Sequence, residues 1–374
     1  MKREISGRVM EVQKYYPVTT ITGPRQSGKT SLCRHLFPEY PYVNLEDIIT
    51  RGRAIADPVG FIDSLGPVAV IDEVQNVPEI LSMIQVRVDE HPEMRFILTG
   101  SSNFSLLHHM TQSLAGRTAL FTLLPFSFHE MTEAEKDIPT WRLLTRGQYP
   151  GILVNGIPDR IFYSNYYTTY VERDVRDLMQ LKNIMKFDVF VRLLASRVGS
   201  EFNASQIAKE AGVSAPTISE WLSILETSYI TFTLRPYFAN ISKQLTKMPK
   251  VYFYDTGFLC YLLGIESEAQ YQSSTLRGAI FENMAITELM KSQFNQGHVP
   301  EVSFYRERSG KEVDAMVRMG GYIHLYEVKA GGTFKPDFLT NINQVAGLLP
   351  GEVTKSVIYD GPTSAPLLLN IRDI

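Results

Sequence analysis

The sequence predicts an α/β fold with a parallel sheet at its N-terminal end, and two stretches carry this prediction. Residues 23–30 read Gly-Pro-Arg-Gln-Ser-Gly-Lys-Thr and fit the pattern G-x-x-x-x-G-K-[ST]. The second stretch is an apolar run, Val68–Ile71, that closes in Asp72 and Glu73. Continuous apolar runs of this length are typical of parallel strands buried on both faces.

The first stretch is a phosphate-binding loop, or P-loop, because a β-branched run (18–22) precedes it and a helix-like run (31–37) follows it. Backbone N–H groups of such a loop form a nest for phosphate oxygens, and the following helix points its positive end at the same anion. We expect Lys29 to reach the β- and γ-phosphates of ATP and the Thr30 hydroxyl to coordinate Mg²⁺. The residues expected to bind ATP are Gly23, Pro24, Arg25, Gln26, Ser27, Gly28, Lys29 and Thr30. A glycine turn that matches by chance is the disfavoured alternative.

The second stretch has the pattern known as Walker B. Its two acids follow a buried strand, and ligands of open α/β sheets bind at the carboxyl ends of strands. Asp72 is expected to hold Mg²⁺, and Glu73 is expected to act catalytically by polarising the attacking water. The alternative is a strand end with two solvated acids, which the upstream P-loop disfavours.

A third strand, 95–102, ends in hydroxyl side chains, so Thr99 or Ser101 is expected to contact the γ-phosphate. Arg117 follows a short helix and is a candidate for the cation that stabilises transition-state charge, in its own chain or in a neighbouring subunit. The alternative for Arg117 is a surface or salt-bridged arginine.

The order of these motifs resembles a group of uncharacterised prokaryotic AAA-type ATPases whose C-terminal part is a domain of unknown function, the AAA_14 and DUF4143 pairing. The residues that carry the resemblance are the P-loop, the strand ending at 44–47, Asp-Glu-Val-Gln at 72–75, Leu-Thr-Gly-Ser-Ser at 98–102 and Leu-Ala-Gly-Arg at 114–117. The resemblance extends over nearly the whole chain. It implies an AAA-type ATPase and says little about what the ATPase acts on.

Four segments are expected: an AAA-type ATPase domain with the start of a helical lid (1–155), a helical linker (156–185), a winged helix-turn-helix-like domain (186–265) and a nuclease-like domain (266–374). In the third segment, two short helices joined through Gly212 precede a β-rich stretch. The second of these helices, 214–226, has no Arg, Lys, Asn or Gln to read bases. Basic residues occur in the following hairpin instead, at Lys243, Lys247 and Lys250. A protein partner is therefore favoured over DNA, and both stay open.

The last segment resembles the PD-(D/E)XK nuclease core, with an acid on a helix (Glu282), Asp314 at a hairpin and Glu327-x-Lys329 on the next strand. Period-2 alternation puts Glu327 and Lys329 on one face of their strand. The three acids offer oxygen ligands for a second Mg²⁺, and Lys329 is expected to orient the attacking water. The alternative is a degenerate nuclease fold that keeps these residues as a buried ion-pair cluster.

Bulk composition limits the remaining choices. The chain has 374 residues, a net charge of −3 and two cysteines, so neither a global basic field nor a disulfide framework is expected. No apolar run approaches the roughly 18 residues of a membrane span, and a cytoplasmic location is expected. Whether the chain forms a homo-oligomer is left open. The favoured function is an ATP-binding and ATP-hydrolysing switch or motor; the alternatives are an ATP-regulated, metal-dependent DNA endonuclease and a nucleotide-gated, non-enzymatic protein-binding module.

Overall fold

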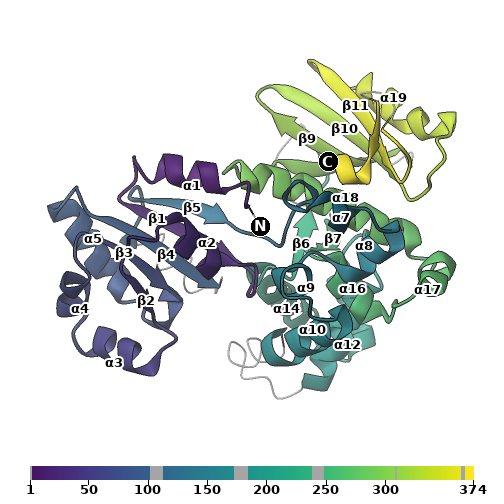
Figure 1. Ribbon diagram of the computed structural model, residues 1–374. Coiled ribbons are helices and arrows are strands. Elements are labelled where there is room, and N and C mark those ends of the chain that lie inside the picture. Colours follow the sequence, from purple (N-terminus) through teal and green to yellow (C-terminus); the bar gives the residue numbers. More distant parts are fainter. Residues whose placement is uncertain (1, 102–112, 172–183, 238–247, 308–309, 364–366) are drawn as a thin grey trace. The chain divides into compact units, whose positions relative to one another are not determined.

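The computed structural model describes residues 2–101, 113–171, 184–237, 248–307, 310–363 and 367–374 (Figure 1). The chain forms two compact units. The N-terminal unit consists of residues 1–125, 227–229 and 293–298, and the C-terminal unit consists of residues 126–226, 230–292 and 299–374. Residues 126–155 thus belong to the C-terminal unit, whereas the sequence predicts them to be part of the first segment, 1–155. The reason is that Lys291 donates to the Phe126 carbonyl (2.9 Å) and to Gln148 Oε1 (2.5 Å).

The N-terminal unit contains a five-stranded, all-parallel sheet, as predicted. Its strands have the spatial order β2-β3-β4-β1-β5. Their bounds are β1 Val18–Gly23, β2 Tyr42–Asn44, β3 Val68–Asp72, β4 Arg95–Ser101 and β5 Thr118–Thr122. In register, Val18 of β1 pairs with Phe96 of β4 and with Thr118 of β5. The P-loop strand therefore lies between two neighbours.

Helices cover both faces of this sheet because adjacent strand residues point to opposite sides. Val70 and Ile97 pack with helices α1 (Ser6–Val12) and α2 (Lys29–Leu36). Their neighbours Ile71 and Leu98 pack in a second core with helices α3 (Ile48–Ala56), α4 (Pro58–Ser64) and α5 (Ile80–Glu90). Two dry cores thus fix the strand ends that carry the predicted site.

The first part of the C-terminal unit is mainly helical. Its helices are α7 Glu133–Lys136, α8 Thr140–Arg146, α9 Pro150–Leu153, α10 Asp159–Tyr166, α12 Ile184–Ala195, α13 Ala204–Ala211, α14 Ala215–Thr227, α16 Thr256–Leu263 and α17 Glu268–Ser273. Strands β6 (Thr231–Leu234) and β7 (Lys250–Phe253) pair antiparallel after α14. Gly212, at φ +67°, turns the chain from α13 to α14. This element order is the one expected for 186–265; the winged-helix assignment itself stays a prediction.

A second five-stranded sheet completes the C-terminal unit. It follows α18 (Arg277–Asn295) and has the order β12-β11-β10-β9-β8. The bounds are β8 Val302–Arg306, β9 Glu312–Met319, β10 Tyr322–Lys329, α19 Thr340–Ala346, β11 Val353–Tyr359 and β12 Leu368–Asn370. Strands β8 to β10 are antiparallel, and β10 to β12 are parallel. A helix, three strands, a helix and a strand occur in the predicted order, with β12 in addition.

Within the ranges given above, no helix has both the length and the apolar character needed to cross a membrane.

Candidate nucleotide-binding site

The P-loop joins the end of β1 to the start of α2 through residues with left-handed backbone. Gly28 has φ +96° and Gln26 has φ +62°. Gly23, at φ +144°, lies so close to the Leu123 carbonyl that an added Cβ would overlap it. Only glycine fits both the conformation and the space at this position. The backbone therefore takes the tight turn that the motif requires.

Lys29, the first residue of α2, lies inside this loop. Its Nζ donates to the carbonyl oxygens of Gly23 (3.0 Å) and Pro24 (2.9 Å), and the residue is 5% exposed. Burial lowers the pKa of Lys29 to about 8, and the nearby acids Glu73 and Asp72 partly oppose this shift. The ammonium is thus held where the loop is expected to receive phosphate.

Asp72, at the end of β3, is the centre of a hydroxyl network. Its Oδ2 accepts from Thr30 Oγ1 and from Tyr42 Oη, both at 2.6 Å. Its Oδ1 accepts from the Thr99 hydroxyl and from the Glu73 backbone N–H (3.1 Å). Thr30 and Asp72, the predicted Mg²⁺ ligands, are therefore adjacent. Their hydroxyl and carboxylate oxygens are the hard donors that Mg²⁺ prefers, so the residues fit the ion.

The Thr99 hydroxyl contacts the Asp72 acid, so in this structure it orients a predicted metal ligand. Its contact with a γ-phosphate stays a prediction. Tyr42 was missed by sequence reasoning, because it stands two residues before the end of a short strand and belongs to no motif. Burial, together with the hydrogen bond to Asp72, raises the pKa of Tyr42 above its ordinary range. The phenol therefore remains a hydrogen-bond donor to the acid.

Glu73 has a left-handed backbone (φ +56°), which turns its side chain off the strand direction. Its Oε2 accepts from Gln75 Nε2 and lies 3.4 Å from both the backbone N and the Oγ of Ser101. Gln75 also donates to Ser101 Oγ (3.1 Å). A strained backbone at a predicted catalytic residue is a common feature of active sites. The sequence indicates Gln75 only as part of the Asp-Glu-Val-Gln motif. Its hydrogen bond to Glu73 Oε2 shows that it positions the Glu73 carboxylate.

Arg117 does not lie at the strand ends where the P-loop, Asp72 and Glu73 are found. Its carbonyl accepts from Val18 N–H (3.2 Å), so it adjoins the start of β1, whereas the P-loop follows the end of β1. The six residues of β1 separate the two by roughly 17 Å. The guanidinium pairs with Asp89 at 2.6 and 2.7 Å. A catalytic role of Arg117 in the site of its own chain is therefore wrong; a role across subunits stays a prediction.

The C-terminal unit contains a separate cluster of buried charges that includes the predicted nuclease residues. Asp314 Oδ2 accepts from the Val328 N–H (2.7 Å), and Lys329 Nζ lies 2.6 Å from Glu327 Oε1. Burial raises the pKa of all three acids, Glu282, Asp314 and Glu327, and the negative charge of Asp314 adds to the shift at the other two. These acids therefore share one electrostatic environment.

Lys250 of β7 also belongs to this cluster. Its Nζ lies 2.5 Å from Glu312 Oε1 and 3.4 Å from Glu282 Oε1, and the residue is 4% exposed. Tyr252 Oη donates to the same Glu282 oxygen (2.5 Å). Lys250, one of the three basic residues noted in the hairpin, therefore adds no exposed positive charge there, because its ammonium is buried and paired with acids. Lys243 and Lys247 lie outside the described residues.

In the described parts of the chain, no group of three or more His, Cys, Asp or Glu side chains is placed to hold a metal ion. The second Mg²⁺ site therefore stays a prediction. The lysines at 250 and 329 contribute positive charge where the nuclease reading expects a cation.

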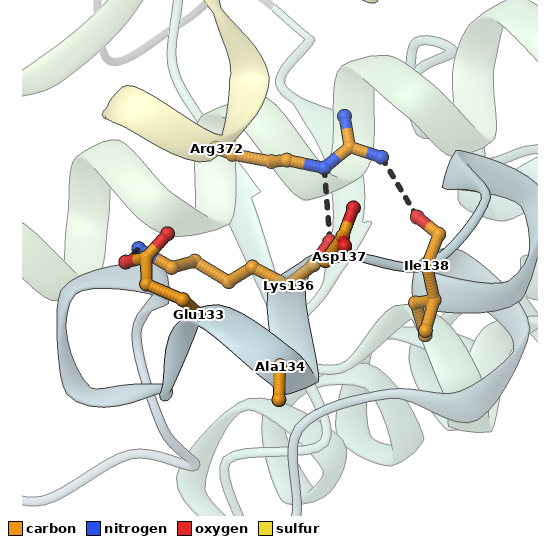
Figure 2. A pocket seen from close by; sticks show the side chains of 6 residues that line it. All are labelled: Glu133, Ala134, Lys136, Asp137, Ile138 and Arg372. Atoms are coloured by element: carbon orange, nitrogen blue, oxygen red, sulfur yellow. Dashed lines mark hydrogen bonds and ion pairs between the residues drawn. The ribbon is translucent and has the colours of Figure 1, made fainter.

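Two surface hollows lie in the described part of the C-terminal unit. One, of about 430 Å³, is lined by α7 and by Arg372 (Figure 2). The Arg372 guanidinium donates to the carbonyls of Lys136 (3.2 Å) and Ile138 (3.0 Å), so these donors are used in hydrogen bonds within the protein. The other, of about 270 Å³, includes Arg235 and Arg318 among its lining residues. Arg318 lies 3.4 Å from Glu301, which offsets the positive charge there.

Three family models match the chain. The model AAA_14, described as an AAA domain, matches residues 15–132. Two domains of unknown function, DUF8612 and DUF4143, match residues 139–269 and 277–372. Uncharacterized proteins are similar along most of the chain. One from Mycobacterium tuberculosis is 29% identical over 339 residues, covering 89% of this chain and 74% of the relative. One from Methanocaldococcus jannaschii is 23% identical over 356 residues, covering 84% of this chain and 76% of the relative.

Solved structures with distant similarity include a Walker-type ATPase of Pyrococcus abyssi, with 17% identity and a TM-score of 0.45 over 70% of this chain and 95% of that one. AMPPCP-bound DnaA from Aquifex aeolicus has 15% identity and a TM-score of 0.30 over 59% of this chain and 86% of that one. The family matches agree with the P-loop geometry and with the order of motifs in the sequence. The order of the matches, AAA_14 and then DUF4143, is the order that the resemblance predicted.

Proposed function

We propose that this chain binds ATP with Mg²⁺ at the P-loop edge of the N-terminal sheet, hydrolyses it, and uses the cycle to switch or drive its C-terminal part. One observation carries the proposal. The Thr30 hydroxyl lies 2.6 Å from the Asp72 carboxylate. Thr30 directly follows Lys29, whose side chain is buried in the loop. A hydroxyl, a carboxylate and a lysine at one strand edge are the groups that hold a nucleoside triphosphate and its metal ion.

Each residue has a distinct role in this proposal. Lys29 binds the β- and γ-phosphates, and Thr30 and Asp72 hold the metal ion. Mg²⁺ held there would neutralise charge on the phosphate oxygens. Glu73 orients a water and takes its proton as the water oxygen attacks the γ-phosphorus, while the bond from that phosphorus to the β–γ bridging oxygen breaks and ADP leaves. Ser101 and Gln75 fix the Glu73 carboxylate, which supports its use in one orientation.

Calorimetry with ATP and Mg²⁺ tests this function. Lys29→Ala is expected to abolish ATP binding, and Glu73→Gln is expected to bind ATP with near wild-type affinity but not to hydrolyse it. Lys14→Ala, at an exposed position after α1, is the matched control and should behave as wild type. Wild-type ATP affinity in Lys29→Ala would refute the proposal.

A second candidate function is an ATP-regulated, metal-dependent DNA endonuclease. The order of Glu282, Asp314 and Glu327-x-Lys329 in the sequence supports it, together with Asp314 accepting from the Val328 N–H (2.7 Å) and Lys329 Nζ lying 2.6 Å from Glu327 Oε1. Plasmid DNA incubated with Mg²⁺ or Mn²⁺ should then acquire nicks that are absent with Asp314→Ala and with Lys329→Ala. Nicks that persist in both variants would point to a contaminant.

A third candidate is a nucleotide-gated binding module without enzymatic turnover, in which ATP sets the assembly state and helices α13 and α14 contact a protein partner. Tight ATP binding without phosphate release would favour this candidate. Sedimentation with and without ATP measures whether nucleotide changes the oligomeric state.

A further inference from the structure

Tyr229 has a backbone conformation that is rare for its type. Among the residues that the structure describes, three that are not glycine have a positive φ: Gln26 (62°), Glu73 (56°) and Tyr229 (54°). The first lies in the P-loop and the second follows the Walker B strand. For a bulky side chain such a φ is an outlier, and strain of this kind concentrates at functional sites.

The turn at the end of α14 explains why position 229 has a positive φ. It does not explain why the residue at this position is a tyrosine. After the helix ends at Thr227, Ile230 N–H donates to the Leu225 carbonyl (2.9 Å). This hydrogen bond closes a left-handed turn at Tyr229, where helices most often have glycine. Helices α13 and α16 do end on glycines in the left-handed conformation, Gly212 (φ +67°) and Gly264 (φ +69°). A tyrosine is strained at such a position, so its side chain must serve another purpose.

The Tyr229 hydroxyl supplies that purpose. It lies 3.1 Å from Thr22 Oγ1 and 3.2 Å from Thr122 Oγ1. Thr22 directly precedes Gly23, the first residue of the P-loop, and Thr122 is the last residue of the neighbouring strand β5. One phenol thus joins the two strand ends beside the predicted phosphate site.

The chain connectivity gives this contact its meaning. Residues 227–229 belong to the N-terminal unit, whereas the chain on both sides of them, α14 and β6, belongs to the C-terminal unit. The segment is three residues long, and its backbone is closed by the hydrogen bond at Ile230. A displacement of the P-loop strand end therefore acts on α14 and β6 through a short, constrained connection.

We propose that Tyr229 is the positioning residue through which the nucleotide state of the P-loop is passed to α14 and β6. This inference rests on the proposed function, since it concerns regulation by the same nucleotide site. ATP binding changes the position of the Thr22–Gly23 strand end. The Tyr229 hydroxyl follows the two threonine hydroxyls and alters the stability of the last turn of α14.

Hydrogen exchange of the amides at 225–234 tests the proposal, measured with and without a non-hydrolysable ATP analogue and Mg²⁺. In the wild type the analogue is expected to change exchange rates there at least fivefold. Tyr229→Phe keeps the ring and the backbone strain but removes the hydroxyl; its change should fall below twofold while its affinity for the analogue stays within threefold of wild type. Thr122→Val should lose the response in the same way, and Thr122→Ser should restore it.

Tyr305→Phe is the matched control, because the Tyr305 hydroxyl donates to Glu307 within the C-terminal unit (2.7 Å). It should keep the full response. A wild type that binds the analogue without any change at 225–234, or a Tyr229→Phe protein that responds as wild type does, overturns the proposal and leaves ATP binding intact. A wild type that does not bind the analogue refutes the proposed function itself, and the coupling that rests on it.

Discussion

Replacing Lys250 by Met tests whether the charge cluster of the C-terminal unit is truly desolvated. Methionine keeps the unbranched shape of the side chain but leaves Glu312 and Glu282 without the ammonium that lies 2.5 and 3.4 Å away. Breaking a buried ion pair by removing one partner costs about 3–5 kcal/mol. The lower end is expected here, because Arg306 lies 3.5 Å from Glu312 and the Tyr252 hydroxyl still donates to Glu282.

The loss should depend on pH in a definite direction. Burial, and then the charge of Asp314, raise the pKa of Glu282 to about 7. A carboxyl with a raised pKa in the folded state favours folding when it is protonated, so this contribution is present at low pH and is lost as pH rises through about 7. In Lys250→Met, Glu282 can take up a proton at pH 5 in place of its lost partner. We therefore expect a loss of about 3 kcal/mol at pH 8 and of roughly 1 kcal/mol at pH 5.

Tryptophan fluorescence reports this change selectively. The chain has two tryptophans, Trp141 and Trp221, and both lie in the C-terminal unit. With a urea dependence of about 2–3 kcal/mol/M, the unfolding midpoint should fall by roughly 1–1.5 M at pH 8. Lys209→Met, at an exposed position of α13, is the control and should stay within about 0.5 kcal/mol of wild type. An equal midpoint shift for Lys250→Met at both pH values, or no shift, would refute the reasoning.

Three further predictions concern the N-terminal unit. ATP affinity should fall roughly tenfold from pH 7 to pH 9, because burial lowers the pKa of Lys29 to about 8 and the amine must regain a proton to bind phosphate. Calorimetry in buffers of different ionisation enthalpy should show proton uptake at pH 9. An ATP affinity that does not change between these pH values would contradict this prediction. Gly23→Ala should abolish ATP binding and lower the melting temperature more than Gly66→Ala, because a Cβ at 23 meets the Leu123 carbonyl and a Cβ at 66 meets open space; equal melting temperatures would count against this packing. Arg117→Ala should leave the ATP affinity of a dilute sample within twofold of wild type, and a tenfold loss there would place Arg117 in its own chain's site after all.

Local motifs identified several residues that the structure brings together at the P-loop. The P-loop, Asp72 and Thr30 could be read from sequence because strand ends of a parallel sheet meet at one edge, and the structure brings these residues within hydrogen-bonding distance. Tyr42 and Gln75 escaped because their contacts depend on strand order and on the left-handed turn at Glu73. Neither of these features is encoded by a residue pattern.

The remaining misses arose where a residue's partners are distant in sequence. Arg117 is a candidate from sequence because it follows a short helix, but it directly precedes β5 and so lies at the opposite ends of the strands from the P-loop. The sequence places Lys250 among the basic residues of a hairpin, but its partners are 32 and 62 positions away at Glu282 and Glu312. The first stretch of the N-terminal unit ends at 125, before the expected domain boundary at 155, and the buried ammonium of Lys291 joins α18 to residues 126–148.

The division of the N-terminal unit among three stretches of sequence has a consequence for how the protein is made. Residues 1–125 include the whole parallel sheet, but the unit also uses 227–229 and 293–298, where Gly297 packs on Phe121 and Asn295 donates to Glu4 (2.8 Å). At roughly 5–20 residues per second, a ribosome needs about 10–35 s after residue 125 to deliver the last of these stretches. During this time the newly synthesised sheet lacks its contacts with 227–229 and 293–298, because these residues have not yet been made. A fragment cut at residue 155 would remain in that unfinished state, and we expect it to aggregate during expression.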